Sequence, residues 1–280
     1  MKKYRLLFAI IFILVNTKNS FGQILDSANI KCNYKLKFIK DTLNKLDTAK
    51  DDQVLLIGSD VNQYFSYTNY KSDSTLKEFI AKQEKTGNAD ISNAPDLGFR
   101  NIPLANLDFT YNLFINKSQQ FIKVFDKIVA DKYTYTDSGF IQHWILTDDT
   151  STIMGYKCQK ADGYFRGRNY IAWFTKDIPV NSGPYKFYGL PGLILKIYDL
   201  KKNFDFECVS IEKLQKKIPI VMETKGFQTI SRNKFESLRK LFFEHPFQFM
   251  LEASGDANTD KAQKLLQFEH PLPYNPIELQ

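Results

Sequence analysis

Gly189-Leu190-Pro191-Gly192-Leu193-Ile194 opens the segment that decides the fold, and an apolar strand pattern continues from there to Leu200. Proline at the second position and glycine at the third position of residues 190–193 predict a type II β-turn, with positive φ at Gly192. Leu193, Leu195 and Ile197 then alternate with Ile194, Lys196 and Tyr198, which is the period of a β-strand. The sequence therefore predicts a structural turn that leads into a buried strand. The alternative is a loop that contacts a ligand, because Gly189 has no side chain to prevent close approach.

Strand patterns recur along most of the chain. Compact polar turns at 116–118, 162–163 and 201–203 join several of them, and connections this short allow only antiparallel pairing. A large open antiparallel sheet curls or splits rather than staying flat. We therefore expect a mainly β fold, in which a large curled antiparallel sheet, shaped like a half-barrel or bowl, carries a few covering α-helices. The expected strands are 32–39, 53–57, 62–70, 109–116, 119–129, 132–136, 142–146, 152–161, 164–175, 193–200 and 203–211.

Two segments, 74–86 and 233–244, carry the apolar period of an amphipathic helix. Ser231 or Asn233 is the expected N-cap of the second helix, and His245-Pro246 is expected to end it. Residues 89–107 are expected to be irregular, and the proline-rich tail 271–280 to be extended. No repeat or linker interrupts the pattern, so residues 23–280 are expected to form a single domain.

The first 22 residues have the pattern of a signal peptide. Lys2 and Lys3 precede an apolar run over residues 6–15, and Ser20 and Gly22 place small residues before an expected cleavage site. The apolar run is too short to span a bilayer, and no later run approaches that length. We therefore expect an exported protein, located in the periplasm, outside the cell or at the outer membrane.

Removal of the signal peptide changes the charge of the protein. Residues 1–22 contain four basic residues and no acid, so their loss lowers the formal net charge from +7 to +3. The remaining basic residues are dispersed rather than clustered, which does not favour binding to a nucleic-acid backbone. No nucleic-acid partner is expected.

Each of the three cysteines, Cys32, Cys158 and Cys208, falls on an apolar strand face. Free cysteine packs as a small hydrophobic residue, so buried thiols are the favoured interpretation. A Cys158–Cys208 disulfide is the alternative, because an exported protein meets an oxidising environment. None of the three has a cysteine or histidine partner at ligand spacing, and no metal site is expected.

The sequence carries no convincing catalytic motif, so we expect neither an enzyme nor a cofactor. His143, His245 and His270 are not spaced as metal ligands, and the last two precede prolines. Asp205 and Glu207 share one strand face and could form a carboxylate pair of the kind that hydrolyses glycosides. That face is predicted to meet solvent, so a carboxylate-based hydrolase is the least favoured function.

The candidate ligand-binding residues are aromatic. Trp173 and Phe174 end an expected strand, and Tyr185, Phe187 and Tyr188 lie in the loop that leads to the glycine motif. Aromatic side chains beside a loop could hold a lipid, an apolar peptide or a sugar ring. Packing in the core is the alternative.

The chain resembles the GLPGLI family, whose members are secreted proteins of Bacteroidota without an assigned activity. The resemblance rests on residues 189–194, 155–161, 172–175, 183–184 and 275–279. It implies a curled or bowl-shaped β-sheet. More distantly, the pattern is similar to the half-barrels that carry lipoproteins across the periplasm, and to the bowl domain that precedes the catalytic part of some bacterial N-glycanases.

The favoured functional hypothesis is non-enzymatic binding of an apolar ligand, or of a segment of an envelope protein partner, in the concavity of the curled sheet. It rests on the 39 Phe and Tyr residues and on the lack of catalytic motifs. The alternative is a module that binds glycans or proteins on its surface.

Overall fold

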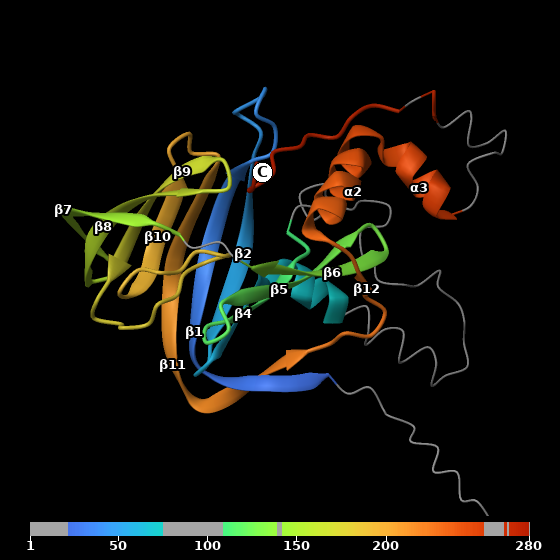
Figure 1. Cartoon of the computed structure of the whole chain (residues 1–280). Coiled ribbons are helices and arrows are strands. Elements are labelled where there is room, and N and C mark those ends of the chain that lie inside the picture. The colour runs from blue at the N-terminus through green and yellow to red at the C-terminus, as the bar shows by residue number, and fades with distance from the viewer. Residues whose placement is uncertain (1–21, 75–108, 139–141, 255–265, 268, 280) are drawn as a thin grey trace, which may run out of the picture.

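Figure 1 shows the computed structural model of the chain, which describes residues 22–74, 109–138, 142–254, 266–267 and 269–279. These residues form a 12-stranded sheet in the order β12-β6-β5-β4-β3-β2-β1-β11-β10-β9-β8-β7. Neighbouring strands are antiparallel except for the short parallel pair of β12 and β6. The strands are β1 (Gln23–Ile39), β2 (Thr48–Ile57), β3 (Val61–Ser66), β4 (Asn112–Asn116), β5 (Phe121–Ile128), β6 (Asp131–Ser138), β7 (Trp144–Ile153), β8 (Tyr156–Phe165), β9 (Arg168–Thr175), β10 (Leu193–Asp199), β11 (Phe204–Met222) and β12 (Gln228–Thr229).

The predicted mainly β, mostly antiparallel fold is confirmed, but the predicted half-barrel is not formed. Across the described residues, the sheet is neither closed nor strongly curled, and β12 and β7 form its two edges. The bending is concentrated in the long strands β1 and β11, which shift register near Asp26, Ala28 and Asn33. Such bulges bend a strand locally. In Figure 1 the first part of β1 and the end of β11 turn away from the rest of the sheet.

This local bend gives the sheet a hydrophobic cluster on each face. The larger cluster covers the face on which Leu36, Leu55 and Phe206 are fully buried. We call this face the inner face and the opposite one the outer face. The smaller cluster contains Ala28 and Ile220 from the bent ends of β1 and β11, packed with residues of β2–β5. Burying a second face under a bent ribbon removes apolar area from water without closing the sheet into a barrel.

Helices cover part of the inner face. Ser231 caps α2 (Arg232–Glu244) by accepting a hydrogen bond from the Lys234 backbone, as predicted. His245 ends α2, but Pro246 then starts α3 (Pro246–Ser254), which the sequence did not predict because proline was interpreted only as a helix stop. Proline is also well suited to the first turn of a helix. Phe235 of α2 packs edge-on against Tyr133.

The segment after β3 departs from the prediction. Residues 67–74 are helical, whereas a strand was expected to continue to residue 70. Asn69 explains part of the difference, because its side chain donates to the Phe109 carbonyl and its backbone N–H donates to the Ser66 hydroxyl. Most of the predicted helix 74–86 and all of the irregular segment 89–107 lie outside the described residues.

The glycine motif is a structural turn before a buried strand, but its predicted type is wrong. The Gly192 N–H donates to the Leu190 carbonyl at 2.8 Å, which closes a three-residue turn around Pro191 rather than a type II turn. Positive φ occurs at Gly189 (99°) and not at Gly192. Glycine is needed at 192 for another reason, since a Cβ there would lie 2.0 Å from the Thr175 carbonyl oxygen.

All three cysteines are buried and free, so the alternative of a Cys158–Cys208 disulfide is wrong. Cys158 lies on β8 and Cys208 on β11, with β9 and β10 between them. Three strand spacings amount to roughly 14 Å, about twice the Cα separation that a disulfide can bridge.

Candidate functional site

The structure separates the five predicted aromatic residues. Phe174, Tyr185 and Phe187 are buried in the inner-face cluster, where the Tyr185 and Phe187 rings lie 6.1 Å apart. Trp173 projects from the opposite, outer face of β9, because neighbouring strand residues alternate. Tyr188 is half-buried, and its carbonyl accepts a hydrogen bond from Trp144. The loop aromatics therefore do not form one site with Trp173.

The inner face is filled by side chains. Ile194 and Ile197, which pair with Phe174 and Ala172 of β9 and share their face, are fully buried. The predicted common face of Leu193, Leu195 and Ile197 is wrong, because a bulge between Ile194 and Lys196 places Leu193 on the opposite face from Ile197. A cavity of about 30 Å³ lies between β5, β6, α2 and the C-terminal tail, lined by Tyr111 and Tyr135 among others. A volume of this size holds about one water molecule. It cannot hold a lipid or a peptide.

The C-terminal tail itself covers the inner face, and residues 269–279 form no regular helix or strand. Arg168 donates to the Asn275 side chain at 2.8 Å and to the Pro276 carbonyl at 2.7 Å. The Asn275 amide donates to the carbonyl of Ile39, and the Leu279 N–H donates to the carbonyl of Arg166. The chain thus places its own segment where a partner segment was expected.

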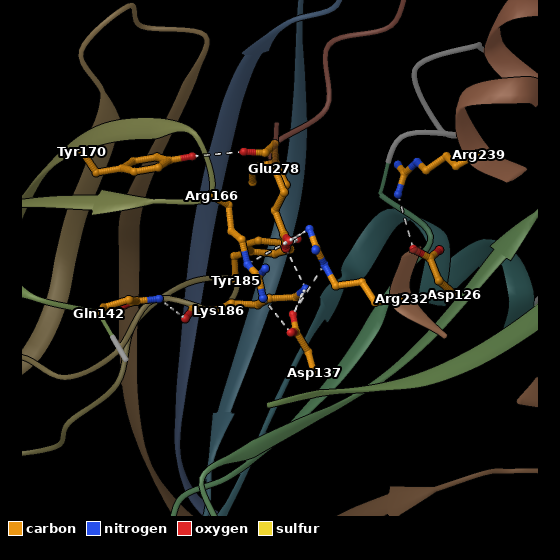
Figure 2. A network of polar contacts seen from close by, with 11 residues as sticks. Asp126, Asp137, Gln142, Arg166, Tyr170, Tyr185, Lys186, Arg232, Arg239 and Glu278 are labelled. Atoms are coloured by element: carbon orange, nitrogen blue, oxygen red, sulfur yellow. Dashed lines mark hydrogen bonds and ion pairs between the residues drawn. The ribbon is translucent and has the colours of Figure 1, made fainter. Parts of the chain in front are cut away.

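A buried ion cluster anchors the end of this tail (Figure 2). Lys186, only 1% exposed, contacts Glu278 at 2.6 Å and Asp137 at 2.9 Å. Arg166 contacts Asp137 at 2.8 Å, and Arg232 contacts Glu278 at 2.8 Å. We call Asp137, Arg166, Lys186, Arg232 and Glu278 the buried ion cluster. Its members come from β6, the β8–β9 turn, the loop before the glycine motif, α2 and the tail, so it joins five segments.

The charges of the cluster stabilise one another. Burial alone raises the pKa of the Glu278 carboxyl, but Lys186, Tyr185 and Arg232 outweigh burial and lower it to about 2. Burial lowers the pKa of the Lys186 ammonium group, and the nearby carboxylates and Tyr135 outweigh burial and raise it above its usual value. Both groups are therefore charged at neutral pH, as a buried ion pair requires.

The cavity beside the cluster contains groups that could carry acid–base chemistry. Burial raises the pKa of Asp126 and of Glu236, in opposition to the lowered pKa of Glu278. Opposite shifts within one site are typical of catalytic acid–base pairs. Asp126 is nevertheless held by Arg239 at 3.4 Å, and the space fits no substrate while the tail is in place. The arrangement fits a structural anchor.

The outer face of β9–β11 carries a more open feature. A groove of about 520 Å³ runs from the β7–β8 turn toward the β10–β11 turn. We call it the outer groove. It is lined by Ser151, Thr152, Ile153, Met154, Trp173, Lys196, Tyr198, Lys202 and Glu207. Two aromatic rings, three hydroxyl groups and charged side chains therefore line this groove.

The sheet register places these groups beside one another. Glu207 on β11 is opposite Lys196 on β10, and Lys196 is opposite Trp173 on β9. The Lys196 ammonium contacts the Glu207 carboxylate at 2.9 Å, while the Lys202 ammonium lies over the Tyr198 ring. Burial lowers the pKa of the Lys196 ammonium group, but the hydrogen bond to Glu207 and the charge of Asp205 outweigh burial and raise this pKa above its usual value. The groove thus combines an aromatic platform with fixed donors and acceptors.

Such a platform fits a ring with a flat apolar face and polar edges. An aromatic side chain can cover the ring face, while hydroxyl and charged groups orient the edges. Glu207 is the single carboxylate among the lining residues, and it is held by Lys196. Asp205 and Glu207 do share the outer face, as expected, where both are half-buried and paired with lysines.

Within the described ranges, no group of three His, Cys, Asp or Glu side chains could hold a metal ion. His143 and His270 are exposed, and His245 lies 3.8 Å from Glu269. The described helices include none with the length and apolar character required to cross a membrane.

Sequence reasoning missed the buried ion cluster. Lys186 lies between Tyr185 and Phe187 in the sequence. A single lysine within a run of aromatic residues could have indicated a buried charge. Glu278 stands in the segment 275–279 that supports the family resemblance, but nothing in the sequence indicates that its partner is Lys186. The outer groove was found only through Trp173.

The comparisons with known proteins identify no activity. A family model described as "Protein of unknown function (Porph_ging)" matches residues 166–196, which run from the β8–β9 turn to the start of β10. No curated protein matches the chain.

Two solved structures are similar to the chain, both of PNGF-II, in space groups P21 and C2. Their sequence identities are 16% and 17%, and the TM-score is 0.46 for each. They cover 76% and 74% of this chain, and the chain spans about a third (32%) of their length. Similarity this low carries no argument about function.

Proposed function

We propose that the mature chain is an exported, non-enzymatic binding module that holds a sugar-like ring in the outer groove. The observation that carries the proposal is the half-buried Trp173, set in a groove of about 520 Å³ between Tyr198, Lys196 and the hydroxyls of Ser151 and Thr152. Export is supported by the basic start and apolar run of the first 22 residues.

The inner face supports an apolar-ligand function less well. The chain's own tail covers it, and the cavity that remains there is about 30 Å³. A ligand at this face would first have to release Glu278 from Lys186 and Arg232. Removing one partner from a buried ion pair is strongly unfavourable.

A glycan array probed with the mature chain tests the proposal. We expect binding to a subset of glycans, and a loss of roughly tenfold or more in affinity for Trp173→Ala, because an aromatic platform contributes on the order of 1 kcal/mol or more. Tyr67→Ala is the matched control, since Tyr67 is 47% exposed and does not line the groove. An array without binding, or equal loss for both variants, would contradict the proposal.

A further inference from the structure

A loop at one end of the sheet exposes two leucines almost completely. Leu43 is 94% exposed and Leu46 is 92% exposed, between β1 and β2. Isolated exposed apolar residues are common, but two leucines exposed to this degree on one short loop are unusual for a surface that meets only water.

The loop that carries these leucines is held in shape by hydrogen bonds. Asp41 caps it by accepting from the Leu43 N–H at 2.8 Å, and Asn44 accepts from the Asp47 N–H at 3.0 Å. Lys40 closes its base by donating its N–H to the Asp47 carbonyl and by pairing with the Asp47 carboxylate at 3.3 Å. The leucines are therefore presented by an ordered loop.

Two neighbouring turns at the same end of the sheet carry further exposed apolar side chains. Leu200, in the β10–β11 turn, is 60% exposed, and Tyr164, before the β8–β9 turn, is 64% exposed. The Leu200 N–H donates to the Asn169 carbonyl, and Asn169 pairs with Tyr164 in the sheet. The Ile39 N–H donates to the Asn203 carbonyl, which joins the β10–β11 turn to the base of the leucine loop.

We call Leu43, Leu46, Tyr164 and Leu200 the apolar rim. Figure 1 shows the β1–β2 loop and the β10–β11 turn projecting at the same end of the molecule. The apolar rim thus combines residues from the β1–β2 loop, the β8–β9 hairpin and the β10–β11 turn, which lie at the same end of the sheet.

Basic side chains accompany the rim. Lys45 lies between the two leucines, and Lys201 follows Leu200, and both lysines are exposed. Asp47 of the leucine loop pairs with Lys40, and Asp41 accepts a hydrogen bond from the Leu43 N–H. Apolar tips flanked by exposed lysines are the pattern of a surface that inserts into the interface of an anionic membrane.

We propose that the apolar rim docks on an anionic lipid surface, with the leucines below the headgroups and the lysines among them. The tyrosine has the amphipathic ring that favours the membrane–water interface. Attachment by a few side chains is reversible, and it would hold the protein at a membrane without a spanning helix. The proposal does not depend on the outer groove.

Sedimentation with vesicles tests the proposal. Mature protein should pellet with vesicles of phosphatidylethanolamine and phosphatidylglycerol, and much less with vesicles of phosphatidylcholine alone. The double variant Leu43→Ser with Leu46→Ser should lose roughly tenfold or more in partitioning, because two buried leucines are removed. The matched control is Ile24→Ser with Val209→Ser, since those residues are 66% and 43% exposed away from the rim.

A second readout is independent of the vesicle pellet. Leu46→Cys labelled with an environment-sensitive dye should shift to the blue when anionic vesicles are added, whereas labelled Ile24→Cys should not. The native thiols are buried and should remain unlabelled in the folded chain. Protein that stays in the supernatant with both vesicle types would overturn the proposal and favour a protein partner for the rim. Equal vesicle binding by the rim variant and the control variant would also overturn it.

Discussion

The inner and outer faces of the sheet differ in how their charges are placed. On the inner face, Lys186 and its carboxylate partners are buried, and the buried ion cluster to which they belong joins five segments. On the outer face, Lys196 and Glu207 form a half-exposed pair beside an open groove. The same kind of ion pair therefore acts as an anchor on one face and as part of a candidate binding surface on the other. This difference is why we place function on the outer face.

The largest expected effect breaks the inner anchor. Lys186→Met removes the buried ammonium group that pairs with Asp137 and Glu278. It should lower the free energy of unfolding by about 3 to 5 kcal/mol, because the two carboxylates stay buried with less compensating charge. Lys196→Met, which removes the corresponding lysine of the outer pair, should cost about 1 kcal/mol or less. Urea unfolding of both variants measures the comparison. Equal costs would show that the two faces do not differ in this way.

The next effect concerns Glu278 and pH. Its pKa is lowered from 4.5 to about 2 in the folded chain, so its stabilising contribution is present above pH 4.5 and is lost as pH falls toward 2. The difference in unfolding free energy between the wild type and Glu278→Gln should be about 3 kcal/mol at neutral pH. It should shrink progressively below pH 4.5. A difference that does not change between neutral pH and pH 3 would contradict the assigned role of the carboxylate.

The smallest effect compares two glycines. Gly192→Ala would force a Cβ against the Thr175 carbonyl, and we expect a cost of about 1 to 3 kcal/mol from overpacking. Gly155→Ala has open space but a φ of 83°, so only backbone strain of about 1 kcal/mol is expected. Thermal unfolding of both variants should rank Gly192→Ala as the less stable. The reverse order would contradict the close approach of the two backbones.

Local pattern in the sequence was enough for most strands and for α2, because alternation and capping are properties of short segments. The apolar content of β10 and the cap at Ser231 are examples, although a bulge between Ile194 and Lys196 interrupts the predicted alternation in β10. The predicted turn at 162–163 was wrong, since those residues lie within β8 and the turns fall at 154–155 and 166–167. The half-barrel was not formed because curvature depends on bulges in β1 and β11, which the sequence pattern does not reveal. The predicted turn type was wrong because glycine is needed at 192 for close packing against the Thr175 carbonyl of β9 and not for a positive φ. The local pattern of residues 190–193 does not show this contact.

The candidate site was only partly predictable for the same reason. Trp173 stood out as an aromatic residue on a strand, but its partners Ser151, Lys196 and Tyr198 come from other strands and depend on the register. The link from Glu278 to Lys186 spans most of the C-terminal third of the chain. Pairing between distant segments is a property of the folded state that a single sequence does not display.

Hydrogen exchange of the mature chain, with and without a glycan selected on the array, shows which face of the sheet binds the ligand. Binding in the outer groove predicts added protection at the end of β7, in β9 and in β10, where Thr152, Trp173 and Lys196 lie. The tail and the segment around Lys186 should remain unchanged. Protection confined to residues 185–188 and 274–278 would contradict the account, because it would place the ligand on the inner face.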